Sequence, residues 1–342
     1  MSTDPSSSGA SAICVAGCGH WGKNLVRNFH QLGHLAGLFD ASPERLAEIG
    51  AQYPQAERFA SFEAAIASPS IQGIAIASPA EMHARMAIQA LEAGKDVFVE
   101  KPLALTAEDG MAMIEAARRG NRILMVGHLL IYHPAIRAIQ KLVESGELGR
   151  LEYLYSNRLS MGKIRREENA LWSFAPHDVS ILLQLTGRMP IQASAVGGTY
   201  LQPNIADVTV SNLLFDSGTR AHIFVSWLHP HKEQRLVVIG SKKMVVFEDS
   251  RTTDKVVLYD KEIAWKNGNI EVSQPKGTPV PFDADEPLSV ECQEFADCIR
   301  TRRRPRTSGE DGVNVLRVLQ ACQRSIELNG APVQLSGAPV TV

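Results

Sequence analysis

The chain has 342 residues, of which 44% are hydrophobic and 21% are charged, a composition typical of a soluble globular protein. This length suits two domains of about 100–200 residues each and excludes a chain that is a coiled coil or disordered throughout. The formal net charge of −2, from 35 basic and 37 acidic residues, indicates no general attraction to nucleic acid or to an anionic membrane.

The five cysteines and the N-terminal segment indicate the compartment. The cysteine count is odd and no Cys-x-x-Cys pair occurs, so a disulfide framework is not expected. Residues 1–10 are Ser-rich and lack the basic-then-apolar layout of a signal peptide. No apolar stretch reaches the roughly 18 residues of a membrane span. We therefore expect a cytoplasmic protein.

The first 130 residues alternate strand and helix signals. Short apolar runs predict strands, and amphipathic stretches between them predict helices. The strands are expected at 12–16, 35–40, 73–77, 96–100 and 123–126, and the helices at 23–32, 43–51, 62–67, 81–93 and 106–119. Strands separated by helices imply right-handed crossovers and a parallel sheet. The prediction is a doubly wound α/β domain over residues 12–130, after a flexible N-terminus at 1–11.

Residues 131–342 show a different pattern and are predicted to form a second α/β domain. Successive strands joined mostly by short turns favour a large, mostly antiparallel open sheet. The strands are expected at 151–157, 193–198, 208–215, 221–227, 235–239, 244–248 and 255–259, and helices at 177–185, 289–300 and 309–329. The Pro-rich, polar stretch 268–287 is predicted to be a loop.

Gly17, Gly19 and Gly22 form a G-x-G-x-x-G fingerprint between the first strand and the first helix, which predicts a Rossmann dinucleotide site. Gly17 permits the tight turn, Gly19 lets the backbone approach a pyrophosphate, and Gly22 lets helix and strand pack closely. Asp40 ends the second strand, where a carboxylate binds the adenosine ribose and repels a 2′-phosphate. The predicted cofactor is therefore NAD, with Arg45 nearby as a residue that could soften the preference over NADP.

Two further segments, 77–83 (Ala-Ser-Pro-Ala-Glu-Met-His) and 97–102 (Val-Phe-Val-Glu-Lys-Pro), together with the glycines, resemble the Gfo/Idh/MocA oxidoreductase family. The resemblance implies a Rossmann domain, a C-terminal domain with a large open sheet, a nicotinamide cofactor and a sugar or cyclitol substrate. It also implies a set of further cofactor-binding residues: His20, Trp21, Ser78, Pro79, His83, Glu100 and Lys101. For His83 a structural role is the alternative.

The stretch 167–178 and the segments 200–203 and 227–230 resemble a narrower branch of this family, the nucleotide-sugar 3-dehydrogenases, and in particular those acting on UDP-N-acetylglucosamine. This resemblance implies oxidation of the C3 hydroxyl of a UDP-sugar, with an aminotransferase acting on the keto product. The substrate residues that we predict are Lys163, Arg165, Arg166, Asn169, Trp172 and His177. The arginines suit a pyrophosphate because a guanidinium binds phosphate through two hydrogen bonds. A solvated loop is the alternative at these positions.

Oxidation of a secondary alcohol needs a hydride acceptor and a base. Lys101, at the carboxyl end of a predicted parallel strand, is the candidate base, and burial and a nearby nicotinamide cation would lower its pKa. His177 could take the proton or orient the hydroxyl. Many family members carry an Asp four residues before this histidine, where this chain has Ser173. Glu167 or Glu168 could substitute for that carboxylate.

The sequence is also compatible with other functions. A dehydrogenase of a free sugar or inositol is the alternative enzyme, and a protein that senses NAD(H) without catalysis is the alternative from another class. No metal site is predicted, because the histidines lack partners at ligand spacing. The arginines at 300–306 favour a solvated turn or a subunit contact over nucleic-acid binding. A broad sheet face favours a homodimer or homotetramer.

Overall fold

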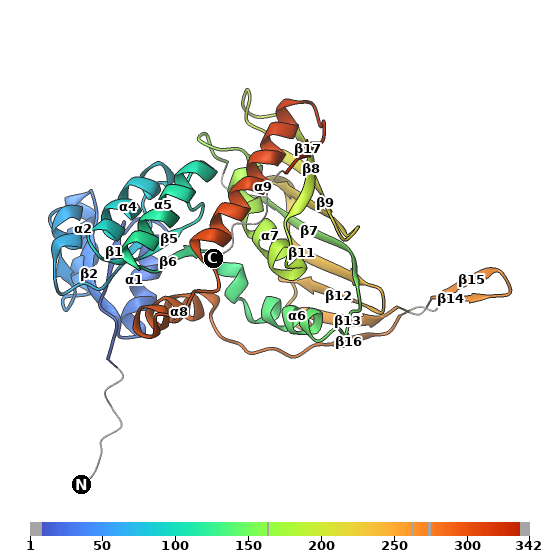
Figure 1. The fold of residues 1–342 in the computed structure, drawn as a ribbon, viewed down its shortest axis with the longest axis horizontal. Coiled ribbons are helices and arrows are strands. Elements are labelled where there is room, and N and C mark those ends of the chain that lie inside the picture. Colours follow the sequence, from blue (N-terminus) through green and yellow to red (C-terminus); the bar gives the residue numbers. More distant parts are fainter. Residues whose placement is uncertain (1–8, 163, 262, 273–274, 336–342) are drawn as a thin grey trace, which may run out of the picture. The chain divides into compact units, whose positions relative to one another are not determined.

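The computed structural model describes residues 9–162, 164–261, 263–272 and 275–335, which divide into two compact units (Figure 1). The first unit contains the chain up to Leu129 together with Glu286–Val313. The second contains Leu130–Asp285 and the chain from Asn314 onward. The pattern of predicted elements places 286–313 in the second domain, whereas in the structure this segment belongs to the first unit. Among the described residues, no helix is both long and apolar enough to cross a membrane.

The described part of the first unit is built on a parallel sheet in the order β3-β2-β1-β4-β5-β6. Its strands are β1 (Ile13–Ala16), β2 (Leu35–Phe39), β3 (Glu57–Arg58), β4 (Gly73–Ile76), β5 (Asp96–Glu100) and β6 (Leu124–Gly127). The helices are α1 (Gly22–Gln31), α2 (Pro43–Gln52), α3 (Phe62–Ala67), α4 (His83–Glu92) and α5 (Ala107–Gly120), with a short 3-10 turn at Ala80–Met82. The strand order reverses between β1 and β4, which is where open α/β sheets bind ligands.

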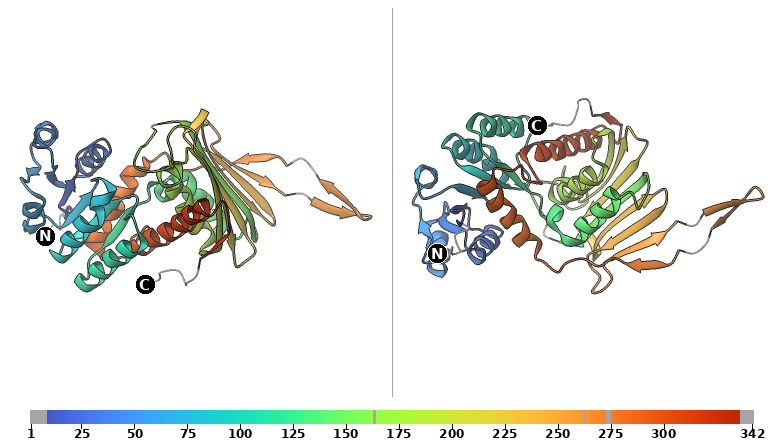
Figure 2. Two further views of the ribbon diagram at one scale, coloured as in Figure 1. Left: turned by 90° about the horizontal axis from the view of Figure 1, so that it is seen from above. Right: turned by 60° about the horizontal axis from the view of Figure 1, so that its bottom comes forward.

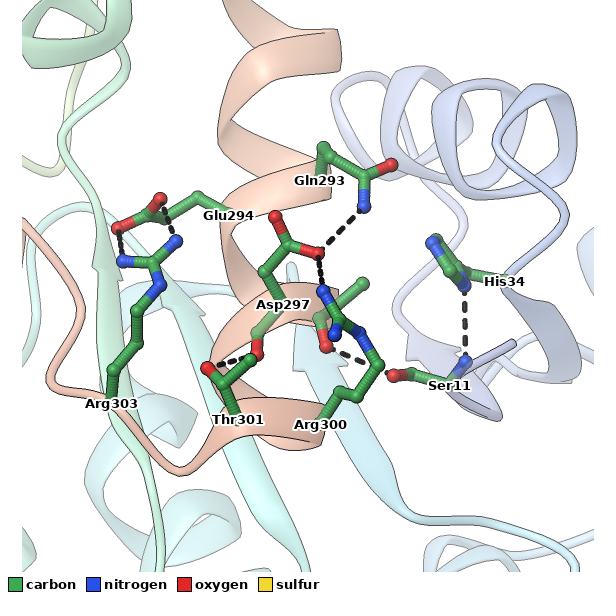
Figure 3. A network of polar contacts seen from close by, with 9 residues as sticks. Ser11, His34, Gln293, Glu294, Asp297, Arg300, Thr301 and Arg303 are labelled. Carbon is green, nitrogen blue, oxygen red and sulfur yellow. Dashed lines mark hydrogen bonds and ion pairs between the residues drawn. The ribbon is translucent and has the colours of Figure 1, made fainter. Parts of the chain in front are cut away.

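The helix α8 (Pro287–Thr301) returns the chain to this unit. The ring of Phe295 contacts Phe29 of α1 and Phe98 of β5, with centroids 6.5 and 5.9 Å apart. Polar contacts also attach α8 (Figure 3): the Ser11 hydroxyl donates to the carbonyl of Ala296 (2.9 Å). These contacts bury the apolar face of α8 against β5 and α1, which is why the segment belongs to the first unit.

The arginine-rich stretch after α8 is held by carboxylates of its own unit. Arg303 makes two hydrogen bonds to Glu294 (2.7 and 2.6 Å), and Arg302 donates to Asp96 (2.6 Å) (Figure 3 shows the first pair). Arg300 pairs with Asp297 at 3.0 Å. This stretch therefore anchors α8 within the first unit, while its arginine side chains stay partly exposed, and a subunit contact there stays a prediction.

The described part of the second unit is built on a sheet in the order β16-β13-β12-β11-β7-β10-β9-β8-β17, antiparallel except where β7 and β10 pair. Its strands are β7 (Leu151–Met161), β8 (Pro190–Gly198), β9 (Val208–Phe215), β10 (Arg220–Ser226), β11 (Leu228–Gly240), β12 (Lys243–Glu248), β13 (Val256–Asp260), β16 (Gly277–Pro279) and β17 (Val333–Gln334). A separate hairpin joins β14 (Ile263–Lys266) and β15 (Asn269–Val272). The helices α6 (Pro134–Glu144) and α7 (Ala170–Thr186) cover one face of the large sheet (Figure 2). The last helix, α9, spans Gly309–Glu327.

Three expectations for this half were wrong. The helix expected from 177 begins at Ala170, because Asn169 caps its first turn and Pro176 is accommodated inside the helix. The helix α6 was not expected, although Pro134 occupies its first turn and His133 caps it. The stretch 268–287 contains β15 and β16 in addition to loop.

Candidate active site

The glycine turn after β1 has the geometry that a dinucleotide site needs. Gly17 adopts a φ of +99°, which side chains rarely tolerate. A Cβ on Gly22 would lie 1.8 Å from the carbonyl oxygen of Gly17, whereas a Cβ on Gly19 would meet only an Arg45 nitrogen at 3.9 Å. Gly22 therefore allows close packing, and Gly19 leaves room for a ligand. In the described residues no side chain caps the N-terminus of α1, so its N–H groups suit a diphosphate.

Asp40 lies beside this turn at the end of β2. Its carboxylate accepts hydrogen bonds from the backbone N–H groups of Cys18 (2.7 Å) and Ser42 (2.8 Å). Arg45, half exposed, approaches the same carboxylate at 3.3 Å. The two backbone bonds fix the carboxylate next to the glycine turn, where NAD would present its ribose hydroxyls. The arrangement fits NAD in both of its parts, the diphosphate and the adenosine ribose.

Glu100 and Lys101 follow each other at the carboxyl end of β5. Glu100 is almost fully buried and accepts a hydrogen bond from the indole N–H of Trp21 and another from the backbone N–H of Lys101 (3.2 Å). Burial raises the pKa of this carboxyl to about 7, although the Trp21 bond and the charge of Lys101 oppose the shift. Burial therefore favours the protonated form of this carboxyl, which lies directly beside Lys101.

His83 joins two loops of the same edge. Its ring nitrogens lie 2.7 Å from the carbonyl oxygen of Pro102 and 2.9 Å from that of Ser78. The side chain is buried, and burial lowers its pKa, so the neutral ring donates to one carbonyl at a time. This geometry supports the structural alternative: His83 positions the Ser78–Pro79 loop and the loop after Lys101. His20, by contrast, is exposed at the glycine turn.

Two buried titratable groups near Lys101 were missed as site residues. Glu291 on α8 is fully buried, and neither of its carboxyl oxygens has a hydrogen-bond partner among the described residues. Burial and the charge of Glu100 raise its pKa well above the usual value. Both ring nitrogens of His128, after β6, are similarly buried without a described partner, and burial together with Lys101 lowers its pKa to about 4. For Glu291 the sequence did contain a signal, because this glutamate lies on the apolar face of the helix predicted at 289–300.

The predicted substrate residues lie in the second unit, before and within α7. Arg165 pairs with Glu168 at 3.1 Å, while Arg166 is exposed. Asn169 accepts from the backbone N–H of Trp172 (3.2 Å) and donates to Gln323 (2.8 Å), so both ends of its amide are used in holding the helix. Asn169 is therefore the cap of α7, and its role in substrate binding stays a prediction. The predicted Lys163 lies outside the described residues.

His177 is a half-buried residue in the third turn of α7, with buried Ser173 one turn before it. The next residue, Asp178, points elsewhere: it accepts from the Ser156 hydroxyl (2.6 Å) and from two nitrogens of Arg158 (2.9 and 3.1 Å). These bonds fix α7 to β7. Asp178 therefore holds the helix that carries His177 and does not replace the carboxylate expected at Ser173.

Comparisons with known proteins identify the family of this chain. Residues 12–128 match the profile described as "Oxidoreductase family, NAD-binding Rossmann fold", and residues 136–246 match the "GFO/IDH/MocA C-terminal domain". The UDP-N-acetylglucosamine 3-dehydrogenase of Acidithiobacillus ferrooxidans is 28% identical over 306 residues, covering 88% of this chain and 93% of that protein. An inositol 2-dehydrogenase of Burkholderia multivorans is 26% identical over 342 residues, covering 96% and 97%.

Solved structures show the same fold over nearly the whole chain. The structure of the Acidithiobacillus ferrooxidans UDP-N-acetylglucosamine 3-dehydrogenase has a TM-score of 0.82 at 25% identity and covers 93% of this chain and 97% of that chain. A levoglucosan dehydrogenase in complex with NADH also has a TM-score of 0.82, at 21% identity, over 96% of this chain and 99% of that one. The two profile matches and the sequence relatives, together with the glycine turn, show that the chain belongs to the Gfo/Idh/MocA family and is an NAD-dependent oxidoreductase of the sugar type.

Proposed function

We propose that this enzyme oxidises the C3 hydroxyl of a UDP-sugar, UDP-N-acetylglucosamine, to the 3-keto sugar. The observation that carries the substrate proposal is the similarity, over most of both chains, to a UDP-N-acetylglucosamine 3-dehydrogenase. Arg165 and Arg166 support it, because they lie in the segment that leads into α7 and guanidinium groups suit a pyrophosphate.

In the proposed mechanism Lys101 is the general base and His177 assists it. Bound NAD supplies the hydride acceptor. Lys101 receives the hydroxyl proton at Nζ, and the adjacent Glu100 carboxylate, when ionised, balances the charge that Lys101 gains. His177 orients the hydroxyl toward Lys101; proton transfer to His177 instead of Lys101 is the alternative. His83 keeps the loop after Lys101 in place through the carbonyl of Pro102.

A dehydrogenase of inositol or a free sugar is the second candidate. It is favoured by the inositol 2-dehydrogenase of Burkholderia multivorans, which this chain resembles to a similar degree. Both candidates use the same cofactor and the same proposed base, so only the substrate distinguishes them.

The decisive experiment is oxidation of a panel of UDP-sugars, free sugars and inositols with NAD, in which NADH formation and product mass are measured together. An aminotransferase that consumes the ketone should be present, because ketone formation is expected to be uphill. Loss of two hydrogens from UDP-N-acetylglucosamine alone supports the proposal, and NMR of the product then assigns the carbon. Activity on inositol or free sugars alone would refute the UDP-sugar proposal.

The proposal extends to the cellular compartment, the oligomeric state and a partner enzyme. We place it in the cytoplasm, where its five buried, unpaired cysteines would stay reduced. We also propose a homodimer or homotetramer, which light scattering would test by the mass of the particle in solution. A sugar aminotransferase is the proposed partner that consumes the keto product.

A further inference from the structure

Exposed apolar side chains gather on two segments of the second unit. Met161 and Ile164, at and just after the end of β7, are 66% and 43% exposed, and Tyr200 and Leu201, after β8, are 72% and 48% exposed. An exposed apolar group of this kind beside polar residues marks an interaction site more often than scattered surface residues do.

Hydrogen bonds hold these two segments together and next to α7. The side-chain amide of Gln202 donates to the carbonyl oxygen of Arg165 (2.7 Å). The backbone N–H of Ala170, the first residue of α7, donates to the carbonyl oxygen of Ala206 (2.9 Å). The segment carrying Tyr200 is therefore fastened to the segment that carries the arginines, so that aromatic and cationic side chains share one surface.

The loop that presents Tyr200 is built on a buried carboxylate. Asp207 is fully buried and accepts from the backbone N–H groups of Tyr200 (2.7 Å) and Leu201 (2.9 Å). The indole N–H of buried Trp227 donates to its other oxygen (2.6 Å). Burial opposes ionisation of this carboxyl, but the three donors outweigh it and lower its pKa, so the loop stays anchored at neutral pH.

The ring of Tyr200 packs against Gly198, and most of the side chain is exposed. A Cβ on Gly198 would lie 2.6–2.8 Å from ring atoms of Tyr200, so the aromatic ring rests directly against this glycine. Most of the Tyr200 side chain is nevertheless exposed to solvent. An exposed aromatic ring that packs against the backbone is a surface on which a planar base can stack.

We propose that this surface is a nucleoside-diphosphate subsite, in which Tyr200 stacks on the nucleobase and Arg165 and Arg166 bind the diphosphate. This inference rests on the proposed function, because it assigns the residues that would recognise the UDP part of the substrate. Arg165 pairs with Glu168 through one guanidinium nitrogen, and a guanidinium carries further N–H groups that can bind phosphate oxygens. Met161, Ile164 and Leu201 are exposed apolar side chains of the same two segments and would help to exclude water from the stacked base.

The test is calorimetric binding of UDP to the full-length wild type, Tyr200→Ala and Tyr200→Phe. Loss of one stacking platform is expected to weaken UDP binding about tenfold in Tyr200→Ala. Tyr200→Phe keeps the ring and should stay within about twofold of the wild type. Inorganic pyrophosphate should bind Tyr200→Ala as it binds the wild type, whereas Arg166→Ala should weaken both UDP and pyrophosphate.

Controls separate this inference from the proposed function. Leu328→Ala removes another exposed apolar side chain of the second unit and should bind UDP normally, and NADH binding reports that every variant is folded. Equal UDP affinity in Tyr200→Ala and wild type overturns the subsite and leaves the proposed function standing. A wild type that ignores UDP and oxidises inositol overturns both. A change of oligomeric mass in Tyr200→Ala at unchanged UDP affinity would instead show that a second copy covers this surface.

Discussion

The glycines after β1 show how single residues define the cofactor site. Gly17 needs its positive φ, and the backbone of Gly17 leaves no space for a side chain at Gly22. Gly19 has free space beside it. Gly17 and Gly22 are therefore needed for the shape of the turn, whereas Gly19 leaves room for the ligand.

This difference predicts opposite outcomes for two substitutions. Gly22→Ala should lower the free energy of unfolding by about 1–3 kcal/mol or more, because the new Cβ collides with the carbonyl of Gly17. Gly19→Ala should keep wild-type stability but weaken NAD binding on the order of tenfold, because its Cβ enters the space for the diphosphate. Denaturant unfolding and calorimetric NAD titration measure the two effects. Unchanged NAD affinity in Gly19→Ala would contradict this placement of the diphosphate.

Lys101 is the residue on which the proposed chemistry depends. Lys101→Ala should lower kcat by about 10²–10⁴-fold, the usual contribution of a positioned base, while NADH still binds. Lys23→Ala, which removes an exposed lysine on α1, is the matched control and should keep full turnover. Steady-state kinetics with the substrate found in the panel would measure both. Near-normal kcat in Lys101→Ala would assign the proton transfer to another group.

At the scale of elements, α8 connects stability to the site. Phe295 and Glu291 lie one turn apart on this helix, and the first contacts Phe98 while the second faces the charge of Glu100, two residues further along β5. The helix thus places a carboxyl without a described hydrogen-bond partner near Glu100, the residue that precedes the proposed base. A buried polar group of this kind costs stability.

Glu291→Met should therefore raise the free energy of unfolding by about 1–3 kcal/mol at neutral pH. The pKa of Glu291 is higher in the folded protein than in the unfolded chain, so the folded state retains a proton that the unfolded state releases. Stability of the wild type thus falls as pH rises above the ordinary glutamate pKa of 4.5, and the advantage of Glu291→Met should grow with pH. Urea unfolding at pH 5, 7 and 9 measures this trend.

Glu294→Gln, on the same helix, is the control with the opposite sign. Burial opposes ionisation of Glu294, but the bonds from Arg303 and Arg306 outweigh it and lower the pKa. This variant should be less stable than the wild type at neutral pH, and the difference should shrink as pH falls through that lowered pKa. A pH-independent gain in Glu291→Met would mean that Glu291 contributes only through packing.

At the scale of the whole molecule, the first unit is discontinuous in sequence. It contains both the glycine turn and α8, which are separated by more than 250 residues of chain. The core of the first unit is therefore complete only when Glu286–Val313 packs against the N-terminal part of the chain.

A chain that ends at Asp285 should consequently lose NADH binding, although it retains every predicted cofactor residue. Without α8, the rings of Phe29 and Phe98 lose Phe295, and the free energy of unfolding is expected to fall by about 3–5 kcal/mol or more, as for loss of a buried aromatic side chain. Circular dichroism and NADH fluorescence would report folding and binding together. Wild-type NADH affinity in the shortened chain would show that α8 is dispensable for the site.

Most strands and helices between residues 12 and 130, and the position of the glycine turn and Asp40 among them, could be predicted from the sequence alone. Hydrophobic periodicity and the glycine spacing are local signals, and strands buried in a parallel sheet are short apolar runs that can be read directly. The strand at Asp96–Glu100 and the helix at Phe62–Ala67 agree with their predicted bounds for this reason. The position of Asp40 at the end of the second strand could also be predicted, because it follows from the spacing between the glycines and the next apolar run.

Contacts between residues far apart in sequence could not be predicted from it. The bond from Trp21 to Glu100, the burial of Glu291 behind Glu100, and the loop that Asp207 and Trp227 hold under Tyr200 each depend on how separate elements meet. The helix α7 likewise runs through Pro176, because Asn169 and the contacts of Asp178 stabilise it against the local signal of a proline. Burial and pairing of charges are properties of the assembled fold, so no local pattern encodes them.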